Sequence, residues 1–502
     1  MGGTRRVVVI GAGLSGLSAA ARLRAAGLEV TVVEAAGAPG GLVRTEELHG
    51  HRFDTGATVL TMPGLIVDAL GALGVDPDEA YRRLALSPID PGYVMNYADG
   101  SSLPIPRDPA QIPNAVEQVF GPAQARGTRE LLDWLRRVYD AEYDVFIDRN
   151  FGGLADLAGP DTRRAAAELV RLRTLGGLTG AVSRFVSDER LQRAFTFQAL
   201  YAGVPPHRAR AIYAIIADMD IGRGLSAPAG GMGRVGEVLA EALIEAGAEI
   251  AYKTRVTALT RNSSGAVTGV ETEAGPVAAD AVVATGERDQ VAALLGERPR
   301  RRLRYSPSAV VVHGLLPAGV ADRWRSGHHT LDFGTAWTRT FTELTRSPGR
   351  PMSDGSFLLT RPAASDPGSF VVDGLESVSV LAPTPNLATA PLDWDTLAAP
   401  YAEEVLATLE ARGYPGIDGL RVLRVDHPGT WLRDGLPAGT PFSAAHTVTQ
   451  TGPMRPRNVW PGTANLVLAG SATVPGVGIP PVLVSGKLAA ARVVEHLDGA
   501  RR

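Results

Sequence analysis

The fold is set close to the N-terminus, by residues 7–16 with the sequence VVVIGAGLSG. Val7 to Ile10 form a short β-branched run of the kind that becomes a buried strand. A helical pattern of small and apolar residues follows and ends at Gly27. A second strand is predicted from Val30 to Val33, and it runs into Glu34, eighteen residues after the last glycine of the motif. This order predicts a βαβ unit with a glycine-rich first turn.

The glycines and the acid of this unit suit the binding of a dinucleotide. Gly11 permits the tight turn, Gly13 lets the backbone approach a pyrophosphate, and Gly16 lets helix and strand pack closely. The helix N-terminus offers N–H groups and a partial positive charge to the phosphates. Glu34 would accept hydrogen bonds from a ribose diol. The alternative is an accidental glycine cluster, but strand, helix and acid are all in register, so the sequence predicts a Rossmann-type dinucleotide site.

The composition limits the chemistry that the side chains alone can perform. None of the 502 residues is cysteine, which excludes disulfides, cysteine-ligated metals and thiol redox relays. No histidines stand at metal-ligand spacing, so no metal site is predicted. The 50 basic and 53 acidic residues nearly cancel, so the charge gives no indication of a nucleic-acid partner. Redox chemistry would need a bound cofactor and an external electron acceptor, such as a quinone or oxygen.

A second glycine motif follows the acidic residue. The pair Gly40 and Gly41 resembles the extended fingerprint of FAD enzymes in the amine oxidase and carotenoid desaturase superfamily, which favours FAD over NAD. Many members have an arginine directly after the pair, where this chain has Leu42. The resemblance implies that Arg44 takes over the contact with a phosphate; a surface arginine is the alternative. Gly56, at the end of the following segment HRFDTG, is included in the predicted cofactor site.

Two later segments are assigned to the same cofactor domain. The first has an amphipathic helix through Val235–Ala246 and then strand-like runs, at 249–253, 254–259, 267–272 and 281–284. In the superfamily, a valine that matches Val256 holds the adenine side of FAD through its backbone. From the residues alone, Val256 is only a strand residue.

The second segment is the C-terminal run. It predicts a strand at Asn465–Leu468, a loop of small residues and prolines, and a final helix. Glycines in such a loop let the backbone contact a flat ring, and a helix N-terminus stabilises negative charge on a reduced flavin. A structural loop without a ligand is the alternative. The residues assigned to the cofactor here are Gly470, Ser471, Gly478 and Ile479.

Segments along nearly the whole chain resemble the phytoene desaturases of the bacterial and fungal type, and specifically their actinobacterial branch. The matching segments are 53–63 (FDTGATVLTMP), 146–151 (FIDRNF), 201–203 (YAG), 439–447 (GTPFSAAHT), 450–453 (QTGP) and 475–485 (PGVGIPPVLVS). Two positions depart from the family. It usually has proline where Ala57 stands, and often histidine or threonine where Val474 stands. Both positions are expected near the flavin or the substrate.

The resemblance implies an FAD-dependent desaturase that removes hydrogen from a long apolar polyprenoid, phytoene or a related carotenoid precursor. The implied route is hydride transfer from an allylic carbon to flavin N5, followed by proton loss and formation of a conjugated double bond. Such chemistry needs the protein mainly to position an apolar rod against the ring and to exclude water. It requires neither a metal nor a protein nucleophile.

Asp148 and Arg149 are the candidate catalytic residues. Asp148 would accept the proton or stabilise the cation, and Arg149 would hold the carboxylate in place; a structural ion pair at a helix end is the equal alternative. His446 could also reach the site, but a lone histidine more often has a structural role. The pair His328-His329 is expected on the surface of a loop.

The predicted fold class is α/β, with a discontinuous Rossmann-type FAD-binding domain. An α+β substrate domain, including a helical part that faces a membrane, is inserted into it. The FAD-binding domain is predicted to comprise 1–80, 225–295 and 456–502, and the substrate-binding domain 81–224 and 296–455.

The membrane relation is predicted from three features. Arginines alternate with apolar residues between Arg163 and Tyr201, which suits monotopic membrane contact, although a solvated helix face over a core is at least as well supported. The uncharged stretch 458–486 is broken by Pro475, Pro480, Pro481 and five glycines, so a spanning helix is not expected. The N-terminal apolar run could pass for a secretion signal, but the glycines that interrupt it favour the alternative, so no signal is expected there. The protein is therefore expected in the cytoplasm, with possible peripheral contact to the inner face of the cell membrane.

Three other functions remain open at this point. A redox-neutral carotenoid isomerase could share the fold, as could an FAD oxidase of an amine, another isoprenoid or another small molecule. The loop Pro475–Pro481 lacks the aromatic residue that an amine oxidase often has beside the flavin. Prenyl-binding escort proteins use the fold without flavin, but the intact glycine and glutamate set argues against that role.

Overall fold

The computed structural model describes residues 5–151, 158–298 and 303–499. Its first sheet has six strands in the order β20-β21-β13-β1-β2-β9. The pairs from β21 to β9 are parallel, and only β20 runs antiparallel. The strands are β1 (Arg6–Ile10), β2 (Glu29–Val33), β9 (Glu249–Ala251), β13 (Ala281–Ala284), β20 (Val459–Trp460) and β21 (Thr463–Leu468). One sheet thus combines strands from three distant parts of the chain.

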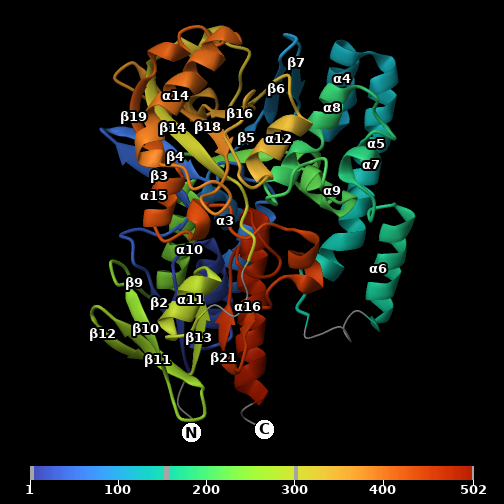
Figure 1. The fold of residues 1–502 in the computed structure, drawn as a ribbon. Helices are drawn as coiled ribbons and strands as arrows, with labels where there is room; N and C mark the ends of the chain where they lie inside the picture. The colour runs from blue at the N-terminus through green and yellow to red at the C-terminus, as the bar shows by residue number, and fades with distance from the viewer. Residues whose placement is uncertain (1–4, 152–157, 299–302, 500–502) are drawn as a thin grey trace.

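Two long helices cover this sheet. Figure 1 shows the sheet and α16 in the lower half of the molecule, with both chain ends at the bottom. Helix α1 (Leu14–Ala25) packs against α16 (Ile479–Gly499), and the hydroxyl of Ser18 donates to the carbonyl of Leu483. Helix α10 (Gly233–Glu245) belongs to the same apolar core. The helix predicted through Val235–Ala246 is confirmed, ending one residue earlier than expected.

The upper half of Figure 1 contains a larger mixed sheet. Its eight strands follow the order β19-β14-β18-β16-β15-β6-β7, with β17 paired to β18. They are β6 (Tyr93–Tyr97), β7 (Ser102–Ile105), β14 (Ser308–Pro317), β15 (His329–Phe333), β16 (Phe357–Thr360), β17 (Val371–Val372), β18 (Leu375–Thr384) and β19 (Arg421–Asp426). Helix α14 (Trp394–Ala411) packs on this sheet and shares a separate apolar core with it.

The expected loop position of His328-His329 is wrong. His329 begins β15, and the two side chains are 4% and 0% exposed. Burial lowers the pKa of His328 to about 4, and it lowers the pKa of His329 further. Both imidazoles are therefore neutral core residues at physiological pH.

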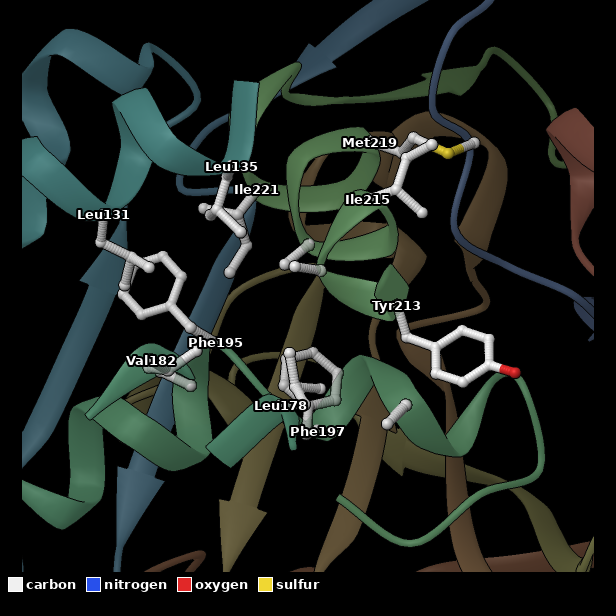
Figure 2. Close-up of a cluster of buried hydrophobic side chains, with 14 of the residues drawn as sticks. Leu131, Leu135, Leu178, Val182, Phe195, Phe197, Tyr213, Ile215, Met219 and Ile221 are labelled. Carbon is white, nitrogen blue, oxygen red and sulfur yellow. The ribbon is translucent and has the colours of Figure 1, made fainter. Parts of the chain in front are cut away.

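A helical arm projects from the larger sheet, at the right of Figure 1. Figure 2 shows part of its core, in which Leu131 and Leu135 of α5 belong to one apolar cluster with Leu178 and Val182 of α7 and with Phe195, which directly follows α8. The helices of the arm are α4 (Ile112–Phe120), α5 (Pro122–Glu142), α6 (Pro160–Arg171), α7 (Leu178–Val182), α8 (Glu189–Ala194) and α9 (Ala214–Ala217).

Shorter elements join these layers. The strands are β3 (Val43–Leu48), β4 (His51–Gly56), β5 (Leu86–Ile89), β8 (Leu225–Pro228), β10 (Val256–Arg261), β11 (Val267–Thr272) and β12 (Gly275–Ala278). The helices are α2 (Gly64–Ala72), α3 (Pro77–Leu84), α11 (Arg288–Leu294), α12 (Thr338–Thr345), α13 (Pro367–Phe370) and α15 (Pro428–Arg433). β5 and β8 pair across the boundary predicted between the two domains. Among the described helices, none is long and apolar enough to cross a membrane.

Candidate functional site

The turn between β1 and α1 is fixed by contacts that only glycine allows. Gly11 has φ of +100°, and a Cβ atom there would lie 2.3 Å from the hydroxyl oxygen of Thr285. A Cβ atom at Gly16 would lie 2.0 Å from the carbonyl oxygen of Gly11. These two glycines are therefore required by packing within the βαβ unit, as the motif predicts.

Gly13 differs because the protein does not fill the space beside it. A Cβ atom there would have a single neighbour within 4 Å, the Cα of Gly41 at 3.7 Å. Gly40 is held opposite, because its N–H donates to the carbonyl of Ala12 at 2.8 Å. Gly13 is the N-cap of α1 and offers no side-chain cap to the first N–H groups of the helix. A cradle of bare backbone at a helix N-terminus fits the pyrophosphate of a dinucleotide.

Glu34 lies at the same end of the sheet. Its two carboxylate oxygens accept hydrogen bonds from the backbone N–H groups of Ala12, at 2.6 Å, and Ala36, at 2.7 Å. These bonds fix the carboxylate and leave lone pairs for a ribose diol. The segment before Val256 lies alongside, since the N–H of Thr254 donates to the carbonyl of Glu34 at 2.8 Å. The predicted ribose-binding residue Glu34 and the predicted adenine-side strand are therefore neighbours.

Arg44 and Gly56 lie on the hairpin of β3 and β4. The guanidinium of Arg44 forms an ion pair with Glu46 at 3.1 Å, while its buried Nε has no hydrogen-bond partner among the described residues. Gly56 is held by the protein itself, because a Cβ atom there would lie 2.0 Å from the carbonyl oxygen of Leu42. Arg44 thus keeps a donor for a phosphate, whereas Gly56 is explained by backbone packing.

The C-terminal loop returns to the first turn of the chain. A Cβ atom at Gly470 would lie 3.2 Å from the hydroxyl of Ser15 and 3.3 Å from the carbonyl of Thr285. The N–H of Gly470 donates to the hydroxyl oxygen of Ser485 at 3.0 Å. Gly478 directly precedes α16, which begins at Ile479. The structure therefore brings the glycines of the C-terminal loop close to the first glycine motif, Gly11–Gly16. The N-terminus of α16 follows directly after that loop.

The candidate catalytic pair is arranged differently from the expectation. Asp148 follows the π-helical turn Tyr143–Ile147, and its Oδ2 accepts from the Nζ of Lys487 at 2.5 Å. Arg149 instead donates to the hydroxyl of Thr162 at 3.4 Å. The predicted support of Asp148 by Arg149 is wrong, because one of the two lysines of the chain is the partner. Lys487 lies eight residues into α16, about 12 Å along the helix from its start.

Several buried polar residues had no signal in the sequence. The hydroxyl of Tyr93 donates to Asp220 at 2.7 Å, and burial raises the pKa of Asp220 to about 7. Burial also raises the pKa of Glu142 well above its usual range. Arg455 has the largest fully buried side chain described. No local motif marks these positions, and Tyr93 and Asp220 lie 127 residues apart in the sequence.

A pocket of about 540 Å³ opens beside the helical arm. His446 and Tyr213 line it, and the ring of His446 lies against Gly476 in the C-terminal loop. Figure 2 shows the hydroxyl of Tyr213 directed away from the core cluster; it bonds the hydroxyl of Thr451 at 2.6 Å. His446 therefore separates this pocket from the loop assigned to the cofactor. Among the described residues, no group of three or more histidines and acids could hold a metal ion.

Comparison with known proteins identifies the family. Residues 14–494 match the family described as flavin containing amine oxidoreductase. The chain belongs to this family. It is therefore an FAD-dependent oxidoreductase, and the bare cradle at Gly13 fits the cofactor.

Among similar proteins, the phytoene dehydrogenase of Streptomyces griseus is 48% identical over 97% of this chain and 94% of its own length. The lycopene-forming phytoene desaturase of Pseudescherichia vulneris is 31% identical, with 98% and 100% of the two chains covered. The zeta-carotene-forming phytoene desaturase of Myxococcus xanthus is 30% identical, with 99% and 95% covered.

Solved structures of other proteins share the fold. Putrescine oxidase with bound putrescine superposes with a TM-score of 0.61 at 16% identity, covering 98% of this chain and 99% of the oxidase. Rab GDI from Plasmodium falciparum gives a TM-score of 0.55 at 11% identity, with 99% of both chains covered. At such identities the likeness shows the fold alone.

The open space at Gly13 yields a test of the cofactor cradle. Gly13→Ala adds a methyl group that the protein accommodates at 3.7 Å from Gly41 but that occupies the space left for a pyrophosphate. We expect FAD affinity to fall by about tenfold or more, since one lost backbone contact to a phosphate costs about 1.5 kcal/mol. Fluorescence titration of the apoprotein with FAD measures this. Gly71→Ala, where the methyl group meets no atom within 4 Å, is the matched control; equal affinities in the two variants would contradict the assignment.

Proposed function

We propose that the protein desaturates phytoene or a closely related apolar polyprenoid. The observation that carries this proposal is the 48% identity with a phytoene dehydrogenase over almost the whole of both chains. The relatives at 30% and 31% identity, over nearly their full lengths, are also phytoene desaturases. Bound FAD supplies the chemistry, by accepting a hydride from an allylic carbon. The residues of the chain bind and orient the substrate and exclude water.

The apolar interior of the helical arm supports the proposal that the substrate has no polar groups. The buried core there continues from α5 to β15 and includes the stacked rings of Tyr97 and Phe333, 5.4 Å apart. Partly exposed apolar residues, including Val59, Met62 and Ile216, pack against this core and come from different segments. A polyene recognised by such surfaces gains binding energy mainly from apolar burial, at about 25 cal/mol per Å².

Asp148 remains the proposed proton acceptor. After hydride loss, the substrate must lose a proton from the neighbouring carbon, and a carboxylate is a suitable base. The other oxygen of Asp148, Oδ1, is buried and has no hydrogen-bond partner among the described residues. In this proposal Lys487 takes the positioning role first given to Arg149, because it holds Oδ2. The electrons leave through an external acceptor, since no cysteine is present to receive them.

Product formation tests the proposed function directly. The FAD-loaded protein is incubated with phytoene in liposomes, with a quinone or oxygen as acceptor. We expect new polyene absorbance together with consumption of the acceptor. An isomerase would change the spectrum without net consumption of acceptor. Retained flavin with no spectral change would contradict the carotenoid assignment and point to another substrate of the family.

Two single substitutions distinguish the role of the Asp148 carboxylate as a base from the role of its ion pair with Lys487. Asp148→Asn removes the base, and we expect kcat to fall by about 10²-fold or more with FAD retained. Lys487→Met leaves the carboxylate in place, and we expect a much smaller loss. Steady-state desaturation and thermal unfolding are measured on both variants. If the pair is only structural, both substitutions will lower stability and activity to the same extent.

We also propose that the pocket mouth meets an anionic membrane surface. Leu175 and Val448 line the pocket and are 64% and 67% exposed. The lining also contains Arg208, Arg210 and Arg304, and no acidic residue among the described ones. None of these three arginines forms an ion pair with a described carboxylate. Exposed apolar groups with uncompensated arginines are typical of contact with anionic lipid.

The arginine stretch from Arg163 to Tyr201 supports membrane contact less well. Arg171 pairs with Glu168, Arg190 pairs with Asp99 and Asp188, and Arg193 pairs with Glu189. Arg184 lies over the ring of Trp134. Most of the charge on this face is therefore compensated within the protein.

Vesicle binding tests the pocket mouth. We expect the double variant Leu175→Glu with Val448→Glu to bind anionic phosphatidylglycerol vesicles at least about tenfold more weakly, since each lost apolar insertion costs about 1.5 kcal/mol or more. Co-sedimentation measures the partition. Leu432→Glu is the control, because this leucine is 50% exposed on α15, on the opposite side of Figure 1 from α7. Equal binding by both variants would place the membrane contact elsewhere.

A further inference from the structure

Arg455 is an isolated buried charge beside the loop assigned to the flavin. Its side chain is 2% exposed, although arginine is rarely buried without a charged partner. Its hydrogen bonds go to four backbone carbonyl groups, of Thr473, Ser471, Gln450 and Ala444. It forms no ion pair with any described carboxylate. The acceptors satisfy the donors without neutralising the charge.

The guanidinium stays protonated at physiological pH. Burial lowers the pKa of Arg455 to about 10, still far above neutrality. The same burial, with the charge of Arg455, lowers the pKa of His446 well below its usual range, so the imidazole beside it is neutral. Glu287 acts on Arg455 at longer range, and burial raises the pKa of this carboxyl group. The direct partners of the Arg455 guanidinium are therefore neutral carbonyl groups, and Glu287 is a carboxyl group that also acts on its charge.

The charge faces the loop that precedes α16. A Cβ atom at Gly476 would lie 3.5 Å from the Cζ of Arg455. The carbonyl groups of Ser471 and Thr473, which Arg455 holds, belong to the same loop. The 21-residue helix α16 begins three residues after Gly476, and its N-terminus carries a partial positive charge. A fixed cation and a helix dipole thus act on one short stretch of backbone.

We propose that Arg455 raises the reduction potential of the bound flavin. The inference rests on the proposed contact between the 470–479 loop and the isoalloxazine ring. In desaturation a hydride, with two electrons, leaves an allylic carbon for FAD, and the neighbouring carbon then loses a proton, whose bonding pair becomes the new double bond. The reduced flavin carries a negative charge until an external quinone or oxygen removes the two electrons. A buried cation nearby stabilises that charge and makes hydride loss from the allylic C–H bond more favourable.

The reduction potential separates this role from a structural one. The FAD-loaded wild type is compared with Arg455→Lys, which keeps the charge, and Arg455→Met, which removes it. Equilibration with redox dyes measures each midpoint potential without any substrate. We expect the Met variant to shift to a clearly more negative potential and the Lys variant to stay close to the wild type. A folded Met variant that binds FAD with an unshifted potential would overturn the proposal.

A pH series keeps the test decisive if the Met variant fails to fold. Burial favours loss of the proton from a lysine at this position, whereas the arginine stays charged. We expect the potential of Arg455→Lys to fall below that of the wild type as pH rises and the amine becomes neutral. The other titratable groups acting on the site, His446, Glu287 and Tyr213, are present in both proteins, so a difference between the two curves originates in the loss of charge at position 455. Parallel pH curves would contradict the proposal. Neither measurement depends on phytoene, so a failed carotenoid assignment would be recognised separately.

Discussion

Direct contact between backbone segments around the N-terminus of α1 holds the cofactor half of the protein together. A Cβ atom at Gly236 of α10 would lie 2.7 Å from the Cα of Gly40, and one at Gly486 of α16 would lie 2.3 Å from the carbonyl of Ser15. One helix therefore packs against Gly40, which lies opposite Gly13, and the other packs against the first turn of α1. Because only glycine allows such approach, the cradle at Gly13, Glu34 and the C-terminal loop have fixed relative positions. The predicted cofactor site depends on this packing.

The same packing explains how the substrate half is attached. Asn150 follows the π-helical turn at the end of α5 and donates to the carbonyl of Leu488, while its own oxygen accepts from Asn458. Asp148 binds Lys487 on the same helix. The helical arm is thus tied by polar contacts to the helix whose N-terminus closes the cofactor loop. A polar junction of this kind fixes the distance between the proposed base and the flavin loop without adding charge to the apolar interior.

The sequence alone predicts an element correctly where that element is defined by its own residues. The motif at Gly11–Gly16, the helix α10 and the strand β13 all follow from local periodicity or glycine spacing, and the family follows from segments along the chain. It was insufficient where the partner is distant. The lysine that holds Asp148 is 339 residues away, and His329 is buried because β15 lies inside a sheet between β16 and β6. No local pattern carries that information.

The distribution of buried charge suits the proposed apolar substrate. A polyene offers no group to balance a charge, so a titratable side chain near it is either neutral or held by the protein. Burial raises the pKa of Glu142 well above its usual range, and Asp220 has its carboxyl group bonded by Tyr93. Buried Arg361 is paired with Glu376. Arg455 has no ion-pair partner among the described carboxylates, and four carbonyl groups hold it beside the C-terminal loop. In the proposed function, its positive charge would face the negative charge that hydride transfer creates on the cofactor.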